Sequence, residues 1–227
     1  MCNECILFED DAIVVVNKPA GMIVHAAPGH REESLADSLA QSRPQMRNVG
    51  SAERPGVVHR LDIETSGVMV FAKTRGAYAR LRRVFERHDK VQKTYLAVLH
   101  GAIKPAKGSI TTLIGRKAWD AKRMAVVEAG GQEAITHWEV LQHQGALAIV
   151  EFKIETGRTH QIRVHAAHLG NPIVGDKLYG DKIKDRRLRT RVERQLLHAV
   201  EITFPHPTSG KMVSFAAPPP EDIIYIS

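Results

Sequence analysis

The chain has 227 residues, of which 43% are hydrophobic and 25% are charged, and its formal net charge is +7. These values are typical of a globular protein with enough apolar material for a core, and the charge favours an anionic partner. The N-terminus lacks the basic and apolar segments of a signal peptide, and no stretch reaches the roughly 20 apolar residues that cross a bilayer. We therefore expect a soluble, cytoplasmic protein with no membrane partner, folded as a single domain over residues 1–227.

Apolar residues that alternate along the chain predict strands in most of its length. The expected strands are residues 6–8, 12–16, 68–72, 94–99, 109–114, 134–141 and 146–154, with further alternation over residues 200–216 and an extended run over residues 22–25. Helices are expected over residues 34–40, capped by Ser34, over residues 76–88, and over residues 160–169, with Thr159 as N-cap and Gly170 just beyond the end. Residues 43–56 contain two prolines and are expected to form a loop. Because strands outnumber helices, the sequence predicts an α+β fold with a mixed, largely antiparallel sheet flanked by helices.

Two segments hold much of the positive charge. Residues 75–93 contain seven basic residues against Glu86 and Asp89, and residues 182–194 contain seven against Asp185 and Glu193. Either segment alone is typical of a solvated helix face. Two such segments in one basic chain favour a nucleic acid as the partner.

Cys2 and Cys5 are the only cysteines, spaced as C-x-x-C. This spacing fits half of a zinc site or a redox motif. A zinc site needs further ligands, and the redox motif needs a βαβ context that this terminus lacks. We expect two reduced thiols and no metal.

Residues 59–67 form a polar loop in front of the strand at residues 68–72. Asp62 lies there close to Arg60, and Gly67 permits the backbone to turn into the strand. Catalytic groups often lie on loops that a rigid sheet supports. The loop alone, however, is more typical of an aspartate that caps a turn or pairs with its neighbour.

Residues 156–165 lead from a strand into a helix. Ile162 lies on the inward face of this helix, and Arg158 and Arg163 lie near its N-terminus. The two arginines either point into a cleft or are solvated on a surface helix. His165 and His168 would supply only two ligands for a metal.

Tyr95 lies on the strand at residues 94–99. Alternation places it on one face with Ala97 and Leu99. A tyrosine in this position either packs in the sheet or lines a cleft, and packing is the commoner case.

Together these segments resemble the RluA-type family of pseudouridine synthases. The matching motifs are Asn17-Lys18-Pro19-Ala20-Gly21, His59-Arg60-Leu61-Asp62 with Thr65-Ser66-Gly67, Lys93-Thr94-Tyr95, residues 156–165, residues 175–180 and Leu197-His198-Ala199. The resemblance extends over about residues 8–220, nearly the whole chain. Many relatives carry an additional S4 domain, for which this chain has no room, so we expect a catalytic domain alone. Lys211 stands where an acidic residue is common.

The resemblance implies the pseudouridine synthase fold with a central RNA-binding cleft, and it gives roles to three residues. Asp62 is the expected nucleophile, Tyr95 the base-stacking aromatic residue, and Arg163 the cation that keeps Asp62 charged. The further residues expected to bind substrate are His59, Arg60, Thr65, Arg158 and Ile162. The expected substrate is structured RNA, a stem-loop of ribosomal or transfer RNA, bound by a monomer.

Three functions compete. The first is an RNA-modifying isomerase that needs neither metal nor organic cofactor, because isomerisation involves no redox change and no hydrolysis. The second is a non-catalytic RNA-binding protein on the same scaffold, but the sequence retains Asp62, Tyr95 and Arg163. The third is a metal-dependent hydrolase, which a chelator would inactivate. We expect the isomerase.

Overall fold

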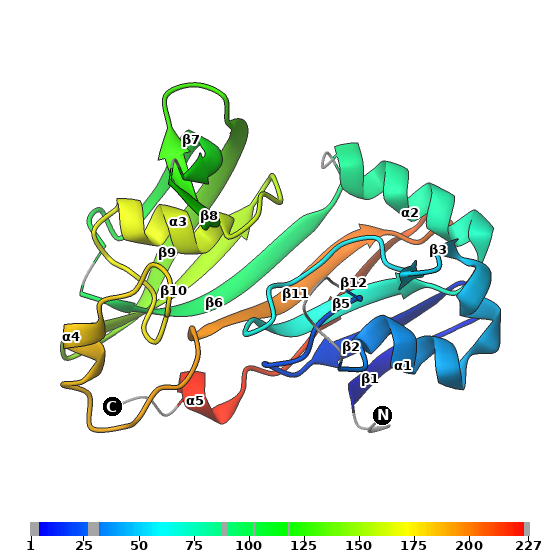
Figure 1. The fold of residues 1–227 in the computed structure, drawn as a ribbon, viewed down its shortest axis with the longest axis horizontal. Coiled ribbons are helices and arrows are strands. Elements are labelled where there is room, and N and C mark those ends of the chain that lie inside the picture. Colours follow the sequence, from blue (N-terminus) through cyan, green and yellow to red (C-terminus); the bar gives the residue numbers. More distant parts are fainter. Residues whose placement is uncertain (1–4, 27–31, 88–89, 102, 118, 225–227) are drawn as a thin grey trace. The chain divides into compact units, whose positions relative to one another are not determined.

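The computed structural model describes residues 5–26, 32–87, 90–101, 103–117 and 119–224 (Figure 1). The chain divides into two compact units. Unit 1 consists of Met1–Gln92 and Ala199–Pro218, and unit 2 of Lys93–His198 and Pro219–Ser227. Helices and a mostly antiparallel sheet are present in each unit, so the predicted α+β class is confirmed.

Unit 1 is built on a sheet with the strand order β1-β2-β5-β11, and β12 pairs with β11. The strands are β1 (Ile6–Glu9), β2 (Ile13–Lys18), β5 (Ser66–Ala72), β11 (Leu197–Pro205), whose first two residues belong to unit 2, and β12 (Met212–Ala216). Every residue of β5 is buried, because both faces of this central strand are covered. The helices are α1 (Leu35–Ser42) and α2 (Arg75–Arg87), close to their predicted positions; the predicted end at His88 lies outside the described residues.

The start of α1 follows from its sequence. Ser34 is the N-cap, as predicted: its hydroxyl accepts a hydrogen bond from the Asp37 amide at 3.2 Å, and the Asp37 carboxylate accepts one from the Ser34 amide at 3.3 Å. The expected extended run at residues 22–25 is irregular instead. The carbonyls of Ile23 and Val24 accept hydrogen bonds from the amides of Leu35 and Ala36. These are amides of the first turn of α1, which have no acceptor within the helix, so the segment pairs with a helix N-terminus instead of with a strand.

Residues 43–56 were predicted to be a loop, but they contain short regular elements. A short 3-10 helix, η2 (Pro44–Asn48), is followed by a small two-stranded ribbon of β3 (Gly50–Ser51) and β4 (Arg54–Pro55). Pro44 at the start of η2 has the fixed backbone angle that a first helical turn requires.

Unit 2 contains five antiparallel strands in the order β6-β10-β9-β7-β8. They are β6 (Gln92–His100), which begins at the last residue of the first segment of unit 1, β7 (Lys107–Lys117), β8 (Asp120–Val127), β9 (Gln132–Gln144) and β10 (Leu147–Ile154). The helices are α3 (Gln161–His168), α4 (Lys182–Asp185) and α5 (Glu221–Ile224). β8 was not predicted, because its first residues, Asp-Ala-Lys-Arg, lack the apolar alternation of a strand.

Helix α3 packs on the sheet of unit 2 through Val164, which clusters with Ile114 and Ala134. The predicted N-cap was wrong: the cap residue is His160, not Thr159, and His160 adopts a left-handed conformation with φ 58°. Gly170 follows the helix with φ 79°, as predicted. Within the described ranges, no helix combines the length and the apolar character needed to cross a membrane.

Candidate active site

Asp62 lies on a turn in unit 1, and the residues Leu61 and Thr65 that anchor this turn are buried. Leu61 is buried, Asp62 is half-buried and Ile63 is exposed. The Thr65 amide donates to the Asp62 carbonyl at 3.1 Å, which closes the turn, and Thr65 itself is 2% exposed. The Asp62 side chain therefore lies on a turn whose backbone is fixed from within.

Lys18 holds this turn from the end of β2. Its side chain is completely buried, and its ammonium group donates to the carbonyl oxygens of Ile63 at 2.8 Å, Pro19 at 2.8 Å and Met22 at 3.0 Å. The Gly21 amide donates to the same Ile63 carbonyl at 2.9 Å, and Gly21 has φ 83°. The Asn-Lys-Pro-Ala-Gly motif thus clamps the residue next to Asp62, and we call this arrangement the Lys18 clamp.

His59 and Gly67 fix the two ends of the same loop. The His59 ring stacks on Phe85 of α2, with centroids 4.8 Å apart, and its Nε2 accepts a hydrogen bond from the Val70 amide at 3.0 Å. Gly67 has φ 122°, and a Cβ on it would lie 2.3 Å from the Ala199 carbonyl oxygen. His59 was predicted to bind substrate; its ring already has protein partners, and its contact with substrate stays a prediction. Arg60 is exposed.

In unit 2, Arg163 forms a buried, two-point ion pair with Asp176. The Arg163 Nε lies 2.7 Å from one carboxylate oxygen and an Nη lies 2.9 Å from the other, and the two residues are 5% and 1% exposed. Burial by itself would raise the pKa of Asp176, but the hydrogen bonds and charge of Arg163, with the amides of Leu178 and Tyr179, hold it below its usual value. Arg163 is therefore not a solvated surface residue, and its guanidinium is held in a fixed orientation.

Tyr179 lies against this arginine. The Arg163 guanidinium carbon is 5.1 Å from the centre of its ring, a distance at which the cation and the ring attract each other. The Tyr179 hydroxyl accepts a hydrogen bond from the Met124 amide at 2.8 Å and shares another with His160 Nδ1 at 2.8 Å. Asp176 and Tyr179 together fix Arg163 from the segment that follows α3.

The first turn of α3 is fixed by buried polar groups. Gln161 is 3% exposed; its amide donates to the Ile135 carbonyl and the Thr136 hydroxyl, both at 2.9 Å, and its carbonyl oxygen accepts from the Thr156 hydroxyl at 2.8 Å. His165, also buried, lies within 2.8 Å of the Thr136 hydroxyl and 2.9 Å of the Thr112 hydroxyl. Burial lowers the pKa of His165 to about 4, so its ring is neutral and structural at physiological pH.

The remaining predicted residues of unit 2 lie around the same elements. Tyr95 is 8% exposed on β6, where it pairs with Phe152 of β10. Lys93 is two residues earlier, and burial lowers its pKa to about 8. Ile162 is buried on α3. Arg158 donates from Nε to the Glu133 carbonyl at 2.8 Å, so it holds the loop before α3 against β9.

The predicted site residues thus fall into two groups. His59, Arg60, Asp62 and Thr65 share one loop of unit 1, and Tyr95, Arg158, Ile162 and Arg163 belong to unit 2. The pairing of Asp62 with Arg163 stays a prediction.

The predicted basic segments are only partly available to a partner. On α2, Arg75 and Arg80 donate to the carbonyls of Asn48 and Pro207, and Arg82 pairs with Glu86. In the second segment, Arg194 is 9% exposed and pairs with Asp222 at 2.7 Å. Most other members of both segments are exposed.

Residues 12–168 match the RNA pseudouridylate synthase family. This chain belongs to that family. The predicted resemblance to RluA-type synthases is confirmed. An uncharacterized RNA pseudouridine synthase of Synechocystis sp. is 39% identical over 217 residues, 95% of this chain and 65% of that protein. Ribosomal large subunit pseudouridine synthase D of Neisseria meningitidis serogroup A is 43% identical over 229 residues, 97% of this chain and 59% of that protein.

The fold agrees with solved structures of the family. Human RNA pseudouridylate synthase domain containing 4 superposes with a TM-score of 0.76 at 27% identity, covering 97% of this chain and 90% of that one. The chain spans 59–65% of the length of the curated relatives named above.

Sequence reasoning missed three structural residues of this pseudouridylate synthase domain. Lys18, Gln161 and Asp176 lie inside motifs that carried the resemblance, yet no role was assigned to them. The signal for Lys18 is a charged residue at the end of an otherwise apolar strand, Ile13–Lys18. A lysine in that place must find buried acceptors.

Cys2 lies outside the described residues, so the expectation for the cysteine pair is not decided. Cys5 is half-buried.

Proposed function

We propose that this chain isomerises uridine to pseudouridine in RNA, with Asp62 as the nucleophile. One observation carries the proposal. A chain of the RNA pseudouridylate synthase family retains Asp62, half-exposed on a turn that the Lys18 clamp fixes. A carboxylate held in this way can attack or remove a proton without first being ordered.

The reaction breaks the N1–C1′ bond of uridine and joins C5 to C1′. N1 keeps the bonding electrons and gains a proton, and C5 loses its proton, so the substrate and the product are isomers. Asp62 must be ionised to take part, and a neighbouring cation favours this form. We assign that cation to Arg163, whose orientation Asp176 and Tyr179 fix.

The uridine must leave the RNA stack before it can react. Extruding a base costs about a few kcal/mol, less in a loop, and stacking on an aromatic ring returns roughly 1–3 kcal/mol. We assign the stacking role to Tyr95. We assign to Arg60, which is exposed two residues before Asp62, the role of filling the space that the base vacates. His59, Thr65, Arg158 and Ile162 would then shape the site mainly by holding its loops.

We take ribosomal RNA of the large subunit as the first substrate class to test. Relatives from Neisseria meningitidis, Zymomonas mobilis and Xanthomonas campestris, 38–43% identical, are named as ribosomal large subunit pseudouridine synthases. A stem-loop of transfer RNA is the second class. We further propose that the chain acts in the cytoplasm, as a monomeric catalytic domain without metal or organic cofactor.

The test is the Asp62→Asn variant, assayed by tritium release from RNA labelled at uracil C5. The amide keeps the size of the side chain but supplies no anion, so we expect folding and RNA binding to persist and release to fall at least about 1,000-fold. Glu64→Gln, on the same turn, is the matched control and should keep release within about threefold.

Substantial tritium release by Asp62→Asn would show that Asp62 is not the nucleophile. Absence of release by the unmodified chain, from ribosomal and transfer RNA alike, would favour an RNA-binding protein without catalysis. Loss of release in chelator would favour a metal-dependent enzyme.

A further inference from the structure

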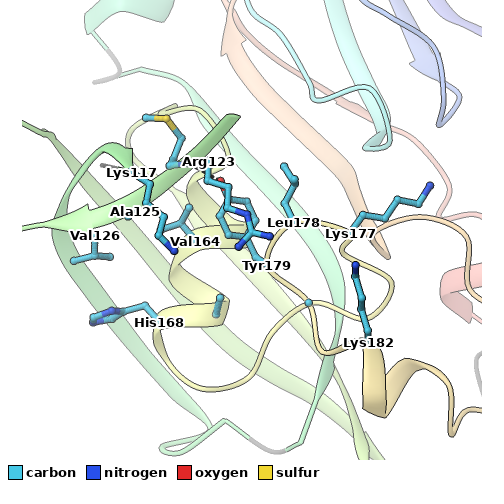
Figure 2. Close-up of a pocket in the computed structure, with 13 residues that line it drawn as sticks. Lys117, Arg123, Ala125, Val126, Val164, His168, Lys177, Leu178, Tyr179 and Lys182 are labelled. Carbon is cyan, nitrogen blue, oxygen red and sulfur yellow. Dashed lines mark hydrogen bonds between the residues drawn. The ribbon is translucent and has the colours of Figure 1, made fainter. Parts of the chain in front are cut away.

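Unit 2 contains a cavity of about 470 Å³ that is lined by basic side chains. It lies among β7, β8, α3 and the segment between residues 177 and 182. Lys117 and Arg123 line it from β7 and β8, and Lys177 and Lys182 line it from the segment after α3. Figure 2 shows these residues with Tyr179 between them, and the end of the Lys177 side chain is directed away from Lys117 and Arg123. We call it the basic pocket.

Among the described residues, the lining of the basic pocket contains no carboxylate. Besides the four cations it includes His168 and Tyr179, and its other members are apolar residues and one glycine. Another cavity, in unit 1, is different, because Glu9 and Glu33 line it together with Arg43. The charged side chains that line the basic pocket, among the residues that the structure describes, are therefore cationic, and they favour an anion there.

The charges of the pocket are largely uncompensated. Lys117, Lys177 and Lys182 are exposed, and none of them forms an ion pair with a described residue. Arg123 pairs with Asp120 at 3.3 Å, but both side chains are about 40% exposed, so this pair is weak. Like charges gathered in one concave place repel each other and attract an anion.

The positive surface continues beyond the pocket. Lys182 begins the second basic segment, and Arg186, Arg187 and Arg189 after it are exposed. Of the two acids within this segment, Asp185 is turned inward: it lies 2.7 Å from His100 Nε2 and accepts a hydrogen bond from the Gly175 amide at 3.1 Å. The other, Glu193, is exposed and pairs with Arg191 at 3.2 Å, beyond these arginines. A nucleic-acid backbone matches this surface better than a single small anion, because the exposed cations extend from the pocket over residues 182–189 of the protein.

We propose that the basic pocket binds backbone phosphates of the RNA substrate, and that the strand continues from it over the second basic segment. This inference rests on the proposed function. Tyr179 lines the pocket, and its ring lies 5.1 Å from the Arg163 guanidinium carbon. A phosphate in the pocket is thus one aromatic ring away from the arginine assigned to the reaction, so the pocket aligns the same RNA whose uridine reacts.

The test is a double variant, Lys177→Gln with Lys182→Gln, in the full chain. The probe is a fluorescein-labelled RNA stem-loop of mixed sequence, and its Kd is measured from 50 to 300 mM NaCl. Removing one to two phosphate contacts should weaken binding about 10-fold or more near 100 mM salt, and should lower the slope of log Kd against log salt by about 1–2.

The matched control is Lys107→Gln with Lys153→Gln. These lysines are 77% and 63% exposed in unit 2, lie outside the pocket, and their removal changes the net charge equally. We expect less than about a threefold change in Kd for the control. Equal losses in the two double variants would overturn the proposal, because general charge and not the pocket would then explain them.

A second arm separates RNA from a free anion. Inorganic phosphate is titrated at constant ionic strength while RNA binding is followed. Weak competition supports a site for a polyanion. Saturable phosphate binding that is lost in the pocket variant, with RNA affinity unchanged, would overturn the proposal in favour of a small-anion site. Both arms measure binding without turnover, so their outcome does not depend on whether Asp62 is the nucleophile.

Discussion

Lys18 is a buried cation that donates hydrogen bonds to three backbone carbonyls. One of these carbonyls belongs to Ile63, which lies 45 residues further along the chain. A buried carbonyl that loses its donor costs about 1–3 kcal/mol. The position of Asp62 therefore depends on a side chain that has no place in the chemistry.

We expect Lys18→Met to lower the free energy of unfolding by at least about 2 kcal/mol, because the carbonyls of Pro19, Met22 and Ile63 each lose the hydrogen bond from the ammonium group. Tritium release should fall more than RNA binding, since the turn under Asp62 is loosened. Urea unfolding and the release assay measure the two effects. Lys211→Met, at an exposed position, should change stability by less than about 0.5 kcal/mol. Unchanged stability of Lys18→Met would mean that the clamp is dispensable.

At the scale of residues, sequence reasoning found the proposed catalytic residues more readily than the residues that fix their positions. Asp62 was placed on a loop in front of a buried strand, where the structure has it. The hydrogen bond between Lys18 and Ile63 was out of reach, because no local pattern reports which distant carbonyls a buried lysine meets. The Arg163–Asp176 pair joins residues 13 apart across a helix end and was missed for the same reason.

At the scale of elements, the contact between Gly67 on β5 and Ala199 on β11 sets how closely two strands approach. A Cβ at Gly67 would lie 2.3–2.7 Å from three backbone atoms of Ala199, closer than real contacts allow. Since the obstacle is backbone, no side chain can move aside. Glycine is therefore the residue that fits at position 67, the second residue of β5.

We expect Gly67→Ala to lower the free energy of unfolding by about 2 kcal/mol or more, from the clash and the positive φ together. Gly76→Ala is the matched control. It lies in α2, with no atom within 4 Å of the added Cβ, so it should stabilise the protein by up to about 1 kcal/mol. Thermal or urea unfolding measures the stability of both variants. Equal effects of the two substitutions would refute the packing argument.

Most elements were predicted within a few residues, because their apolar alternation is strong. β8 was missed, since its first residues are polar and it pairs with β7 at the end of the sheet order. The start of α3 was misplaced by one residue. His160 occupies a left-handed conformation and bonds Tyr179 through its side chain, and a non-glycine residue in that conformation has no simple sequence signal.

At the scale of the whole molecule, stability in mild acid should depend on His165. Its pKa of about 4 in the fold lies below the value near 6.5 expected in the unfolded chain. As the pH falls through 6.5, the unfolded chain binds a proton that the folded chain does not. The free energy of unfolding should therefore fall between pH 6.5 and 4, by up to about 3 kcal/mol, and this contribution should then level off.

Urea unfolding at pH 7.5 and pH 5 measures this loss. In His165→Gln the part due to His165 should disappear, even if the variant is less stable at both values. His143→Gln, at an exposed position, should behave as the unmodified chain does. An equal loss in His165→Gln and in the unmodified chain would assign the acid sensitivity to other groups.

Neither unit is one continuous stretch of chain. Unit 1 takes its last two strands, β11 and β12, from residues that follow most of unit 2. A single genetic crossover between two relatives inside unit 2 would therefore give a chain in which β2 and β5 come from one parent and β11 from the other. Exchange of a whole unit needs three junctions, after Gln92, His198 and Pro218, that must all fit. Recombination is thus a poor route to new combinations of the two units, and we expect them to have diverged together.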